Sequence, residues 1–390
     1  MDCAPANASE AVNDFYLLAL SMRWIRNQHA SRQSLCKEAI MKTLITGGAG
    51  FIGSNLVRYL IRDKGCSVLS FDALTYAGNL HSLSDVADHP KYKFVHGDIR
   101  RPDSIAVAIS EFQPDVVMHL AAESHVDRSI SNPSMFVETN VIGTCNVLNA
   151  SLEYWQQLAP DLKPEFRFLH VSTDEVFGSL GETGFFDEET SYDPRSPYSA
   201  SKAASDHLAR AWHHTYGLPI LITNCSNNYG PFQFPEKLIP VVILKCINEE
   251  EIPVYGRGEN VRDWLFVGDH CSALWTVARK GKSGETYAIG GNNELRNIDL
   301  VNLICDKLDQ LRPRRNGKSY RELIAFVQDR PGHDKRYAID ATKIRDELGW
   351  QPTPDAAKTF EDTIVWYLEN ESWWRDILNG NYRLERLGTL

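Results

Sequence analysis

Short apolar runs alternate with longer amphipathic stretches from Met41 onward. The runs lie at 42–46, 67–71, 93–96, 115–120, 166–172 and 220–222. Runs of this length, bounded by glycine or polar residues, are typical of buried strands, and the stretches at 54–63, 141–150 and 199–216 have the character of helices. Strands that alternate with helices predict an α/β fold with a doubly wound parallel sheet. Further strands and a helix at 298–311 predict a smaller α/β lobe in the carboxyl-terminal half.

Three polar residues, Thr173, Asp174 and Glu175, follow the run at 166–172 directly. A strand that is buried on both faces should stay apolar to its end, and an open α/β sheet binds ligands at the carboxyl ends of its strands. Two adjacent carboxyl groups there could act as an acid and a base with different pKa values. Solvated acids at a strand exit are the simpler interpretation of this pair alone.

A glycine-rich turn follows the first predicted strand. After Gly47, the residues Gly48, Gly50 and Gly53 fit G-x-G-x-x-G between a strand and a helix. Glycines in this pattern allow a tight turn and close approach of a pyrophosphate to the amino terminus of the helix. Asp72 ends the second strand near the spacing expected for an acid that binds a ribose hydroxyl. The combination predicts a dinucleotide site that prefers NAD, because a carboxylate repels the 2′-phosphate of NADP.

A tyrosine and a lysine lie four residues apart, at Tyr198 and Lys202, on one face of the predicted helix at 199–216. A phenol is a poor base at its ordinary pKa of about 10. A nearby ammonium group should lower that pKa and stabilise the phenolate. Tyr-x-x-x-Lys is common by chance, but after a dinucleotide motif it indicates a redox base.

Other strand ends carry candidate cofactor residues. Asp98 and Ile99 follow the third strand. Leu120 ends the fourth strand, and the small or polar residues Ala121, Ala122, Glu123 and Ser124 follow it. His119, within the fourth strand, is interpreted as a satisfied core histidine. Asn140, directly before the next helix, and Asn146, within it, could brace neighbouring backbone.

Composition narrows the class of protein. The formal net charge of −10 gives no indication of a nucleic-acid face or an anionic membrane surface. The eight cysteines show neither a Cys-x-x-Cys pair nor zinc-ligand spacing, so no metal site is expected. We expect the cysteines to be reduced thiols in the cytoplasm. The apolar run at 15–22 is too short to span a bilayer. We expect 1–40 to be an upstream extension, 41–228 mainly an NAD-binding domain and 229–390 mainly a substrate lobe, with the two lobes interleaved.

The motifs together resemble a known family. Gly48-x-Gly50-x-x-Gly53 with Tyr198-x-x-x-Lys202 is similar to the extended short-chain dehydrogenase/reductases, which are Rossmann-domain enzymes. Within that family, the segments 172–178, 74–79 and 329–334 resemble those of the dTDP-glucose 4,6-dehydratases. The resemblance covers about residues 41–368. Phe177 stands where this group usually has tyrosine, and related epimerases generally lack the acid pair.

The resemblance implies a set of binding residues. It places NAD against Phe51, Ile52, Asp72, Ala73, Leu74, Thr75, Asp98, Ile99, 120–124, Thr139, Tyr198, Lys202 and Asn228. It places the nucleotide sugar against Ser124, Thr173, Asn227, Lys237, Leu238, Pro253, Val254, Tyr255, Arg262, Asn297, Asp329, Arg330, Pro331, Gly332 and His333. For each cation a solvated surface position is the simpler alternative, and for Asn297 it is a plain helix N-cap. A homodimer and a role in deoxysugar formation, such as rhamnose for surface polysaccharides, are further expectations from the resemblance.

The implied reaction is an internal redox dehydration of dTDP-glucose. Tyr198, with Lys202 beside it, takes the proton of the 4-hydroxyl, and Thr173 orients that oxygen. Glu175 then removes the C5 proton while Asp174 protonates the departing 6-hydroxyl. A UDP-sugar dehydratase and a 4-epimerase of the same fold remain as alternatives, and a non-catalytic NAD-binding module is disfavoured by the retained residues.

Overall fold

The computed structural model describes residues 40–329 and 333–379. The predicted extension at 1–40 therefore lies outside the described residues except for Ile40, and so do Arg330, Pro331 and Gly332 of the predicted substrate site. The described residues from Met41 onward form one compact unit.

The centre of this unit is a seven-stranded sheet in which every neighbouring pair of strands is parallel. Its order is β3 (Tyr92–His96), β2 (Ser67–Asp72), β1 (Lys42–Thr46), β4 (Val116–His119), β5 (Arg167–Thr173), β6 (Ile220–Cys225) and β10 (Thr286–Ile289). The strand order reverses between β1 and β4, and such a switch point is where open α/β sheets bind ligands. The predicted doubly wound fold is confirmed.

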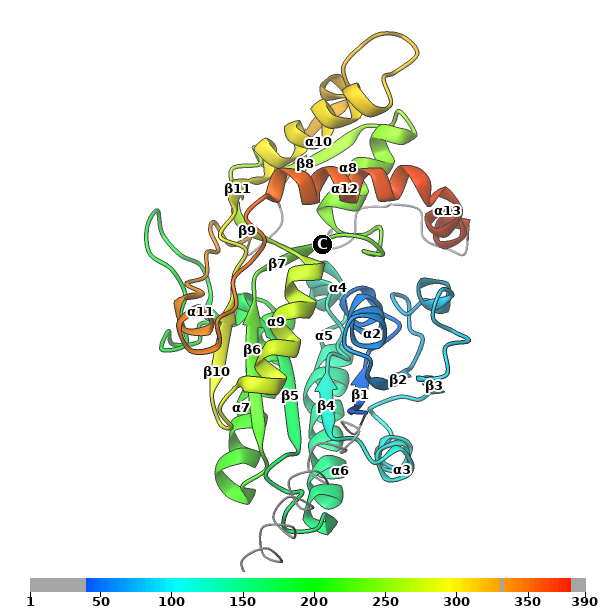
Figure 1. Cartoon of the computed structure of the whole chain (residues 1–390). Helices are drawn as coiled ribbons and strands as arrows, with labels where there is room; N and C mark the ends of the chain where they lie inside the picture. The colour runs from blue at the N-terminus through cyan, green and yellow to red at the C-terminus, as the bar shows by residue number, and fades with distance from the viewer. Residues whose placement is uncertain (1–39, 330–332, 380–390) are drawn as a thin grey trace, which may run out of the picture. The chain divides into compact units, whose positions relative to one another are not determined.

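Helices cover both faces of the sheet (Figure 1). On one face lie α2 (Phe51–Arg62), α9 (Val267–Lys280) and α11 (Thr342–Leu348), and on the other lie α3 (Pro102–Phe112), α6 (Thr144–Gln157) and α7 (Pro197–Tyr216). Neighbouring strand residues supply opposite faces, because side chains alternate along a strand. Ile45 and Leu169 pack with the first set of helices, whereas Leu44 and Phe168 pack with the second. Burial on both faces explains the almost unbroken apolar runs.

Several helix boundaries differ from the sequence prediction. The helix α2 begins three residues before the predicted start, and α7 begins at Pro197 because Ser196 forms a capping box with Ser199. The predicted helix at 141–150 belongs to a longer helical stretch of α5 (Pro133–Phe136), the π-helical η2 (Val137–Gly143) and α6. Apolar periodicity cannot reveal a π-helical turn, which breaks the 3.6-residue repeat.

The second lobe is built around two small sheets. One pairs β8 (Ile252–Tyr255) with β12 (Ile324–Val327), and the other has the order β11 (Glu294–Arg296), β9 (Val261–Phe266) and β7 (Asn227–Tyr229). Around them lie the helices α8 (Leu238–Ile247), α10 (Asn297–Leu311), α12 (Ala356–Glu369) and α13 (Glu371–Asn379). Trp373 and Trp374 are buried in this core, so the helix α13 packs against the lobe.

The two halves of the chain interleave. The strand β10 and the helices α9 and α11 come from the second half but complete the seven-stranded sheet and its outer layer. Shorter helical segments, η1 (Leu80–Leu83), α4 (Val126–Ser131), η3 (Asp174–Phe177) and η4 (Tyr320–Leu323), connect the main elements. Within the described part of the chain, no helix is both long enough and apolar enough to cross a membrane.

Candidate active site

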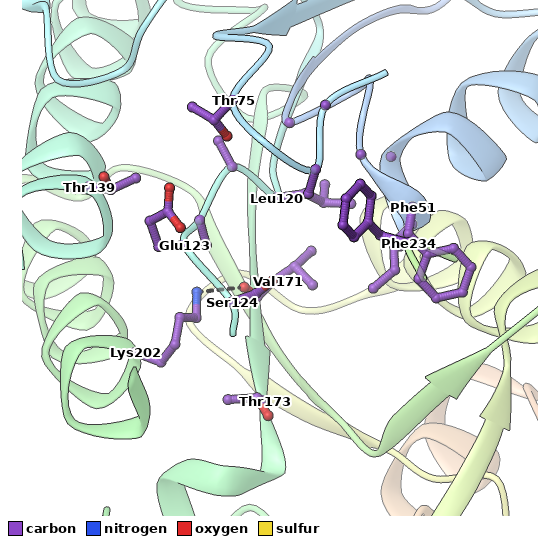
Figure 2. A pocket seen from close by; sticks show the side chains of 18 of the residues that line it. Phe51, Thr75, Leu120, Glu123, Ser124, Thr139, Val171, Thr173, Lys202 and Phe234 are labelled. Carbon is purple, nitrogen blue, oxygen red and sulfur yellow. Dashed lines mark hydrogen bonds between the residues drawn. The ribbon is translucent and has the colours of Figure 1, made fainter. Parts of the chain in front are cut away.

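A cavity of about 490 Å³ opens at the carboxyl ends of the central strands (Figure 2). It brings together all five predicted catalytic residues and most of the predicted cofactor residues. Its lining includes Gly47, Gly50, Phe51, Ile52, Gly53, Asp72, Ala73, Thr75, Asp98, Ile99, 120–124, Thr139, Thr173, Asp174, Glu175, Tyr198, Lys202, Asn227, Asn228 and Lys237. Gly48 and Leu74 do not line the cavity. Residues more than 150 positions apart in the sequence therefore share one site.

The glycine turn leaves room at one glycine only. A Cβ atom on Gly53 would lie 2.1 Å from the Gly47 carbonyl oxygen, and one on Gly48 would lie 2.1 Å from Ser70 Oγ. A Cβ atom on Gly50 would meet a single neighbour, at 3.3 Å, and Gly50 lines the cavity. The first turn of α2 starts beside it, with no acidic residue and no side-chain cap. Its free amides and positive dipole end favour a bound phosphate.

Asp72 and Asn140 fix two loops of the cavity wall. The Asp72 carboxylate accepts hydrogen bonds from the amides of Ala49, at 2.9 Å, and Leu74, at 2.8 Å. The Asn140 side chain accepts from the amide of Glu123 and donates to its carbonyl, at 2.8 and 2.9 Å. Asn140 thus braces backbone as predicted, and it does so from the π-helical turn.

The predicted core histidine is also confirmed. His119 is buried, and its two ring nitrogens hydrogen-bond Thr46, at 2.7 Å, and Thr144, at 2.9 Å. Because both of its ring nitrogens are hydrogen-bonded to hydroxyl groups, His119 links β4 to β1 and to α6. Asn146 likewise donates to the Ile99 carbonyl at 2.9 Å, as expected.

The acid pair lies at the end of β5, where the chain turns into η3. The Thr173 hydroxyl accepts from the amide of Glu175 at 3.3 Å and donates to Asp174 Oδ1 at the same distance. Asp174 is 1% exposed, and its Oδ2 has no hydrogen-bond partner among the described residues. Burial raises the pKa of Asp174 well above its ordinary value, and the negative charges of Glu175 and Asp263 raise it further. A protonated Asp174 beside Glu175 follows from this environment.

Tyr198 and Lys202 come from the first two turns of α7. Burial raises the pKa of Tyr198 well above its ordinary value, and the negative charge of Glu175 adds to this. The Lys202 ammonium donates to the Val171 carbonyl at 2.9 Å (Figure 2). The predicted lowering of the phenol pKa by Lys202 is therefore not found in the ligand-free protein, because burial and the charge of Glu175 dominate.

The remaining predicted substrate residues lie outside this cavity. Tyr255 and His333 stack edge to face with ring centroids 6.2 Å apart, and His333 hydrogen-bonds Asp329 at 2.6 Å. The Arg262 guanidinium lies 4.1 Å from the centre of the Tyr337 ring. This second set also includes Leu238, Pro253, Val254 and Asn297, none of which lines the cavity.

Asn297 is the first residue of α10, and Arg296 occupies the N-cap position. The N-cap interpretation of Asn297 is therefore wrong. Its Oδ1 atom is buried and has no hydrogen-bond partner among the described residues. A buried, unpartnered acceptor fits a ligand contact better than a structural role.

Several cavity residues were not predicted. They are Phe71, Ala77, Gly78, Gly97, Arg100, Met135, Val171, Ser172, Cys225, Ser226, Gln233, Phe234 and Glu236. The last three belong to the segment between β7 and α8, where Tyr76 donates a hydrogen bond to Glu236 at 3.1 Å. A polar segment with aromatic residues directly before Lys237 was the available signal, but only the fold brings it over the cofactor strands.

Comparison with known proteins identifies the family. The family model described as GDP-mannose 4,6 dehydratase matches residues 44–363. A dTDP-glucose 4,6-dehydratase of Xanthomonas campestris pv. campestris is 58% identical over 349 residues, which are 88% of this chain and 98% of that protein. The chain belongs to the dTDP-glucose 4,6-dehydratase family.

Solved structures agree with this membership. The dTDP-glucose 4,6-dehydratase of Bacillus anthracis, crystallised in complex with NAD, is 45% identical, has a TM-score of 0.77, and the match covers 86% of this chain and 99% of that one. A UDP-glucose 4-epimerase of Thermotoga maritima has a TM-score of 0.75 at 26% identity, with 85% of this chain and 100% of that one covered. The dehydratases thus share their fold with epimerases, and the site residues have to distinguish the two chemistries.

The cavity of this family member fits NAD. The open space at Gly50, the uncapped amides of α2 and the carboxylate of Asp72 occur in the order that a pyrophosphate and an adenosine ribose require. Tyr198 and Lys202 line the same cavity as the acid pair, and the charge of Glu175 acts on Tyr198. The redox end of the cofactor and the reacting sugar can therefore meet at the carboxyl end of β5.

Proposed function

We propose that this protein converts dTDP-glucose to dTDP-4-keto-6-deoxyglucose with loss of water and no net use of a reductant. The observation that carries the proposal is the adjacent pair Asp174 and Glu175 in the same cavity as Tyr198, with Asp174 buried so that its pKa is raised well above the ordinary carboxyl value. Elimination of water needs an acid and a base on neighbouring atoms of the sugar. An adjacent pair of carboxyl groups with separated pKa values provides both.

The NAD site is assigned to the cavity wall formed by the glycine turn and the ends of β2, β3 and β4. Gly50 and the amides of α2 would hold the pyrophosphate, Asp72 the adenosine ribose, and Tyr198 and Lys202 the nicotinamide ribose. Bound NAD would accept a hydride from C4 of the sugar and return it to C6. The roles of all these residues rest on their positions and on the family resemblance.

Oxidation at C4 requires a base for the 4-hydroxyl proton. Tyr198 takes that proton, and Thr173 hydrogen-bonds the same oxygen and orients it. The phenol is protonated in the ligand-free protein, because burial and Glu175 raise its pKa. The positive charges of Lys202 and of the oxidised cofactor favour the phenolate once the site is occupied.

Elimination follows because the new 4-ketone makes the C5 proton acidic. Glu175 removes this proton, and Asp174 donates its own to the 6-hydroxyl, which departs as water. When the hydride is returned to C6, C5 regains a proton from Glu175, which completes the 4-keto-6-deoxy sugar. Asp174 can protonate the 6-hydroxyl at neutral pH because its pKa is raised well above the ordinary carboxyl value. The unpartnered Oδ2 atom of Asp174 is the position from which such a proton can be delivered.

The second set of residues would bind the nucleoside diphosphate. Arg262 can grip phosphate oxygens, Tyr255 can pack against a base, and Asn297 offers a buried acceptor. Lys237 hydrogen-bonds the Ser124 carbonyl at 3.0 Å and lines the cavity, so it can bridge the sugar and the diphosphate. Arg330, Pro331 and Gly332 join this proposal from the family resemblance alone.

A 4-epimerase is the second candidate, since epimerases share the fold. Epimerisation needs a redox base at C4 but no acid at O6 and no base at C5. A protonated Asp174 in the cavity has no task in that reaction, which favours dehydration. A UDP-sugar dehydratase differs only in the base that is recognised, and one methyl contact is worth about 1–3 kcal/mol.

The test is to incubate the purified protein with dTDP-glucose or UDP-glucose, without any added reductant, and to analyse the sugar products. We expect a 4-keto-6-deoxy product from dTDP-glucose at a rate at least tenfold above that from UDP-glucose. A galactose epimer with no keto sugar would refute dehydration, and a preference for UDP-glucose would refute the assigned nucleotide.

Cellular context is proposed more broadly. Free thiols at the described cysteines support a reducing compartment such as the cytoplasm. A homodimer and the supply of deoxysugars, such as rhamnose, for polysaccharides follow from the family resemblance. Size-exclusion chromatography with light scattering tests the first of these, and product analysis of cell-surface sugars after gene deletion tests the second.

A further inference from the structure

A fully buried carboxylate, Asp206, lies on α7 one turn beyond Lys202. Tyr198, Lys202 and Asp206 are spaced four residues apart, so they share one face of the helix. Asp206 is 0% exposed and does not line the cavity. The mechanism proposed above gives it no task, and an unpaired buried carboxylate would be costly.

Four side chains donate hydrogen bonds to this carboxylate. His170 donates at 2.9 Å, Ser172 at 2.8 Å, Tyr192 at 2.9 Å and Asn224 at 3.4 Å. The donors come from β5, from β6 and from the segment before α7. Asp206 therefore ties the strand that ends in the acid pair to its neighbour and to the catalytic helix.

The four donors leave the negative charge of Asp206 in place. Burial lowers the pKa of His170, and the positive charge of Lys202 lowers it further, so the imidazole is neutral at physiological pH. The two hydroxyl groups and the amide are neutral as well. Burial alone would raise the pKa of Asp206, but the hydrogen bonds from His170 and Ser172 and the positive charge of Lys202 lower it. Asp206 is therefore ionised, and none of the four side chains that hydrogen-bond it carries a positive charge.

Lys202 lies one helical turn before Asp206 on the same face of α7 and lines the cavity. It is 5% exposed, and burial lowers the pKa of its ammonium group, whereas the charge of Asp206 raises it. The other titratable groups around the pair are Cys225 on β6, His119 on β4 and Arg210 on α7, which reaches Tyr192 at 2.9 Å. Burial raises the pKa of the Cys225 thiol, so no thiolate replaces Asp206 as the counter-charge. Burial lowers the pKa of His119, so its imidazole adds no second positive charge.

We propose that Asp206 is a positioning residue that keeps Lys202 positively charged and holds the carboxyl end of β5 in register with α7. The second effect runs through Asn224, which donates both to Asp206 and to the Thr173 carbonyl, the latter at 3.0 Å. The proposal deepens the proposed function and rests on it for the role of Lys202. Without Asp206, Lys202 would lose its proton at a lower pH and would stabilise the phenolate less.

The primary experiment compares Asp206→Asn with Tyr192→Phe. The first variant removes the charge with little change in size, and the second removes a neutral donor from the same carboxylate but keeps the charge. We expect the alkaline limb of the pH profile of kcat/KM to move down by about one unit or more in Asp206→Asn. The Tyr192→Phe profile should coincide with the wild type. Equal shifts, or none, in the two variants would overturn the proposal.

The second readout does not depend on dehydration. The affinity for NAD is measured by calorimetry between pH 6 and 9.5. As pH rises, this affinity should begin to weaken at a lower pH in Asp206→Asn than in the wild type. An inactive wild type with this displaced binding curve would refute the proposed function and keep the inference. Superimposable binding curves would refute the inference whatever the activity.

A double variant guards against failure of Asp206→Asn to fold. Removing Asp206 alone leaves a buried ammonium without its counter-charge, whereas Lys202→Met with Asp206→Asn removes both charges. We expect the double variant to melt at a higher temperature than Asp206→Asn, because the two losses are coupled. Additive losses of melting temperature would show that the two residues do not act on each other and would contradict the proposal.

Discussion

The glycine turn provides a prediction in which three similar substitutions should have three different results. Alanine in place of Gly53 would put its Cβ atom 2.1 Å from the Gly47 carbonyl oxygen and 2.8 Å from the Gly48 Cα. Both neighbours are backbone atoms that pair within the sheet and the turn, so they cannot move away cheaply. We expect Gly53→Ala to lower the free energy of unfolding by about 3 kcal/mol, the upper part of the range for overpacked cores.

Alanine in place of Gly48 meets mainly a side chain. Its Cβ atom would lie 2.1 Å from Ser70 Oγ and 2.8 Å from Ser70 Cβ. Gly48→Ala should therefore also be destabilised, but a second change, Ser70→Gly, removes both of these atoms. We expect the double variant of Gly48→Ala with Ser70→Gly to regain most of the lost melting temperature. The double variant of Gly53→Ala with Ser70→Gly should not regain it.

Alanine in place of Gly50 should fold normally. The backbone of Gly50 is extended, at φ −77° and ψ −179°, which an alanine adopts readily. Reduced freedom of the unfolded chain stabilises such a change by about 0.4–1 kcal/mol, and the poorer N-cap cancels most of this gain. The new methyl group would project into the space where a phosphate approaches the amides of α2. We expect NAD binding to weaken by about 10- to 100-fold, or roughly 1.4–2.8 kcal/mol.

The assay combines thermal unfolding with calorimetric titration of NAD. The account requires that Gly50→Ala keeps the wild-type melting temperature and loses affinity, whereas Gly53→Ala loses melting temperature. Unchanged NAD affinity in a folded Gly50→Ala protein would refute the assigned pyrophosphate position.

Three further predictions concern the acid pair. Asp174→Asn and Glu175→Gln should each slow elimination by about 10²–10⁴-fold, and exchange of the C5 proton with solvent should disappear in Glu175→Gln but persist in Asp174→Asn; the reverse pattern in a deuterium-exchange NMR experiment would exchange the two roles. Asp174→Asn should also be more stable than the wild type near neutral pH. The pKa of the Asp174 carboxyl is higher in the folded than in the unfolded protein, so the wild type loses stability as pH rises from the unfolded pKa of about 3.9 toward the folded one. The difference in melting temperature between Asp174→Asn and the wild type should therefore widen between pH 4 and pH 7. A constant difference would mean that Asp174 is ionised in the folded protein. Finally, Glu175→Gln should lower the pKa of Tyr198, because the charge of Glu175 raises it. The phenolate absorbance of Tyr198 is measured as the difference between a protein and the same protein carrying Tyr198→Phe. This absorbance should appear at lower pH in the Glu175→Gln background than in the wild-type background.

The sequence pattern predicted the fold because its signals were local. Buried parallel strands must be apolar, and the turn between β1 and α2 excludes side chains at Gly48 and Gly53, so both features are visible in the residues themselves. The proximity of Tyr198 to Asp174 and Glu175 could also be anticipated, because parallel strands place their carboxyl ends along one edge.

The unpredicted parts depend on contacts between distant segments. Asp206 looks like a solvated acid on an amphipathic helix until β5, β6 and the segment before α7 supply its four donors. Glu236 and Phe234 join the cavity only because the β7–α8 segment folds back over the cofactor strands. The expected effect of Lys202 on Tyr198 was wrong for the ligand-free protein, because a sequence contains no measure of burial or of the opposing charge of Glu175.

The most direct test of the central claim follows one hydrogen atom through the reaction. dTDP-glucose labelled with deuterium at C4 is incubated with the protein, without added reductant, and the product is analysed by NMR and mass spectrometry. Internal hydride transfer within one cavity predicts a 4-keto-6-deoxy sugar that carries the deuterium at C6. A product without deuterium at C6, or recovery of only the substrate and its C4 epimer, would contradict the account.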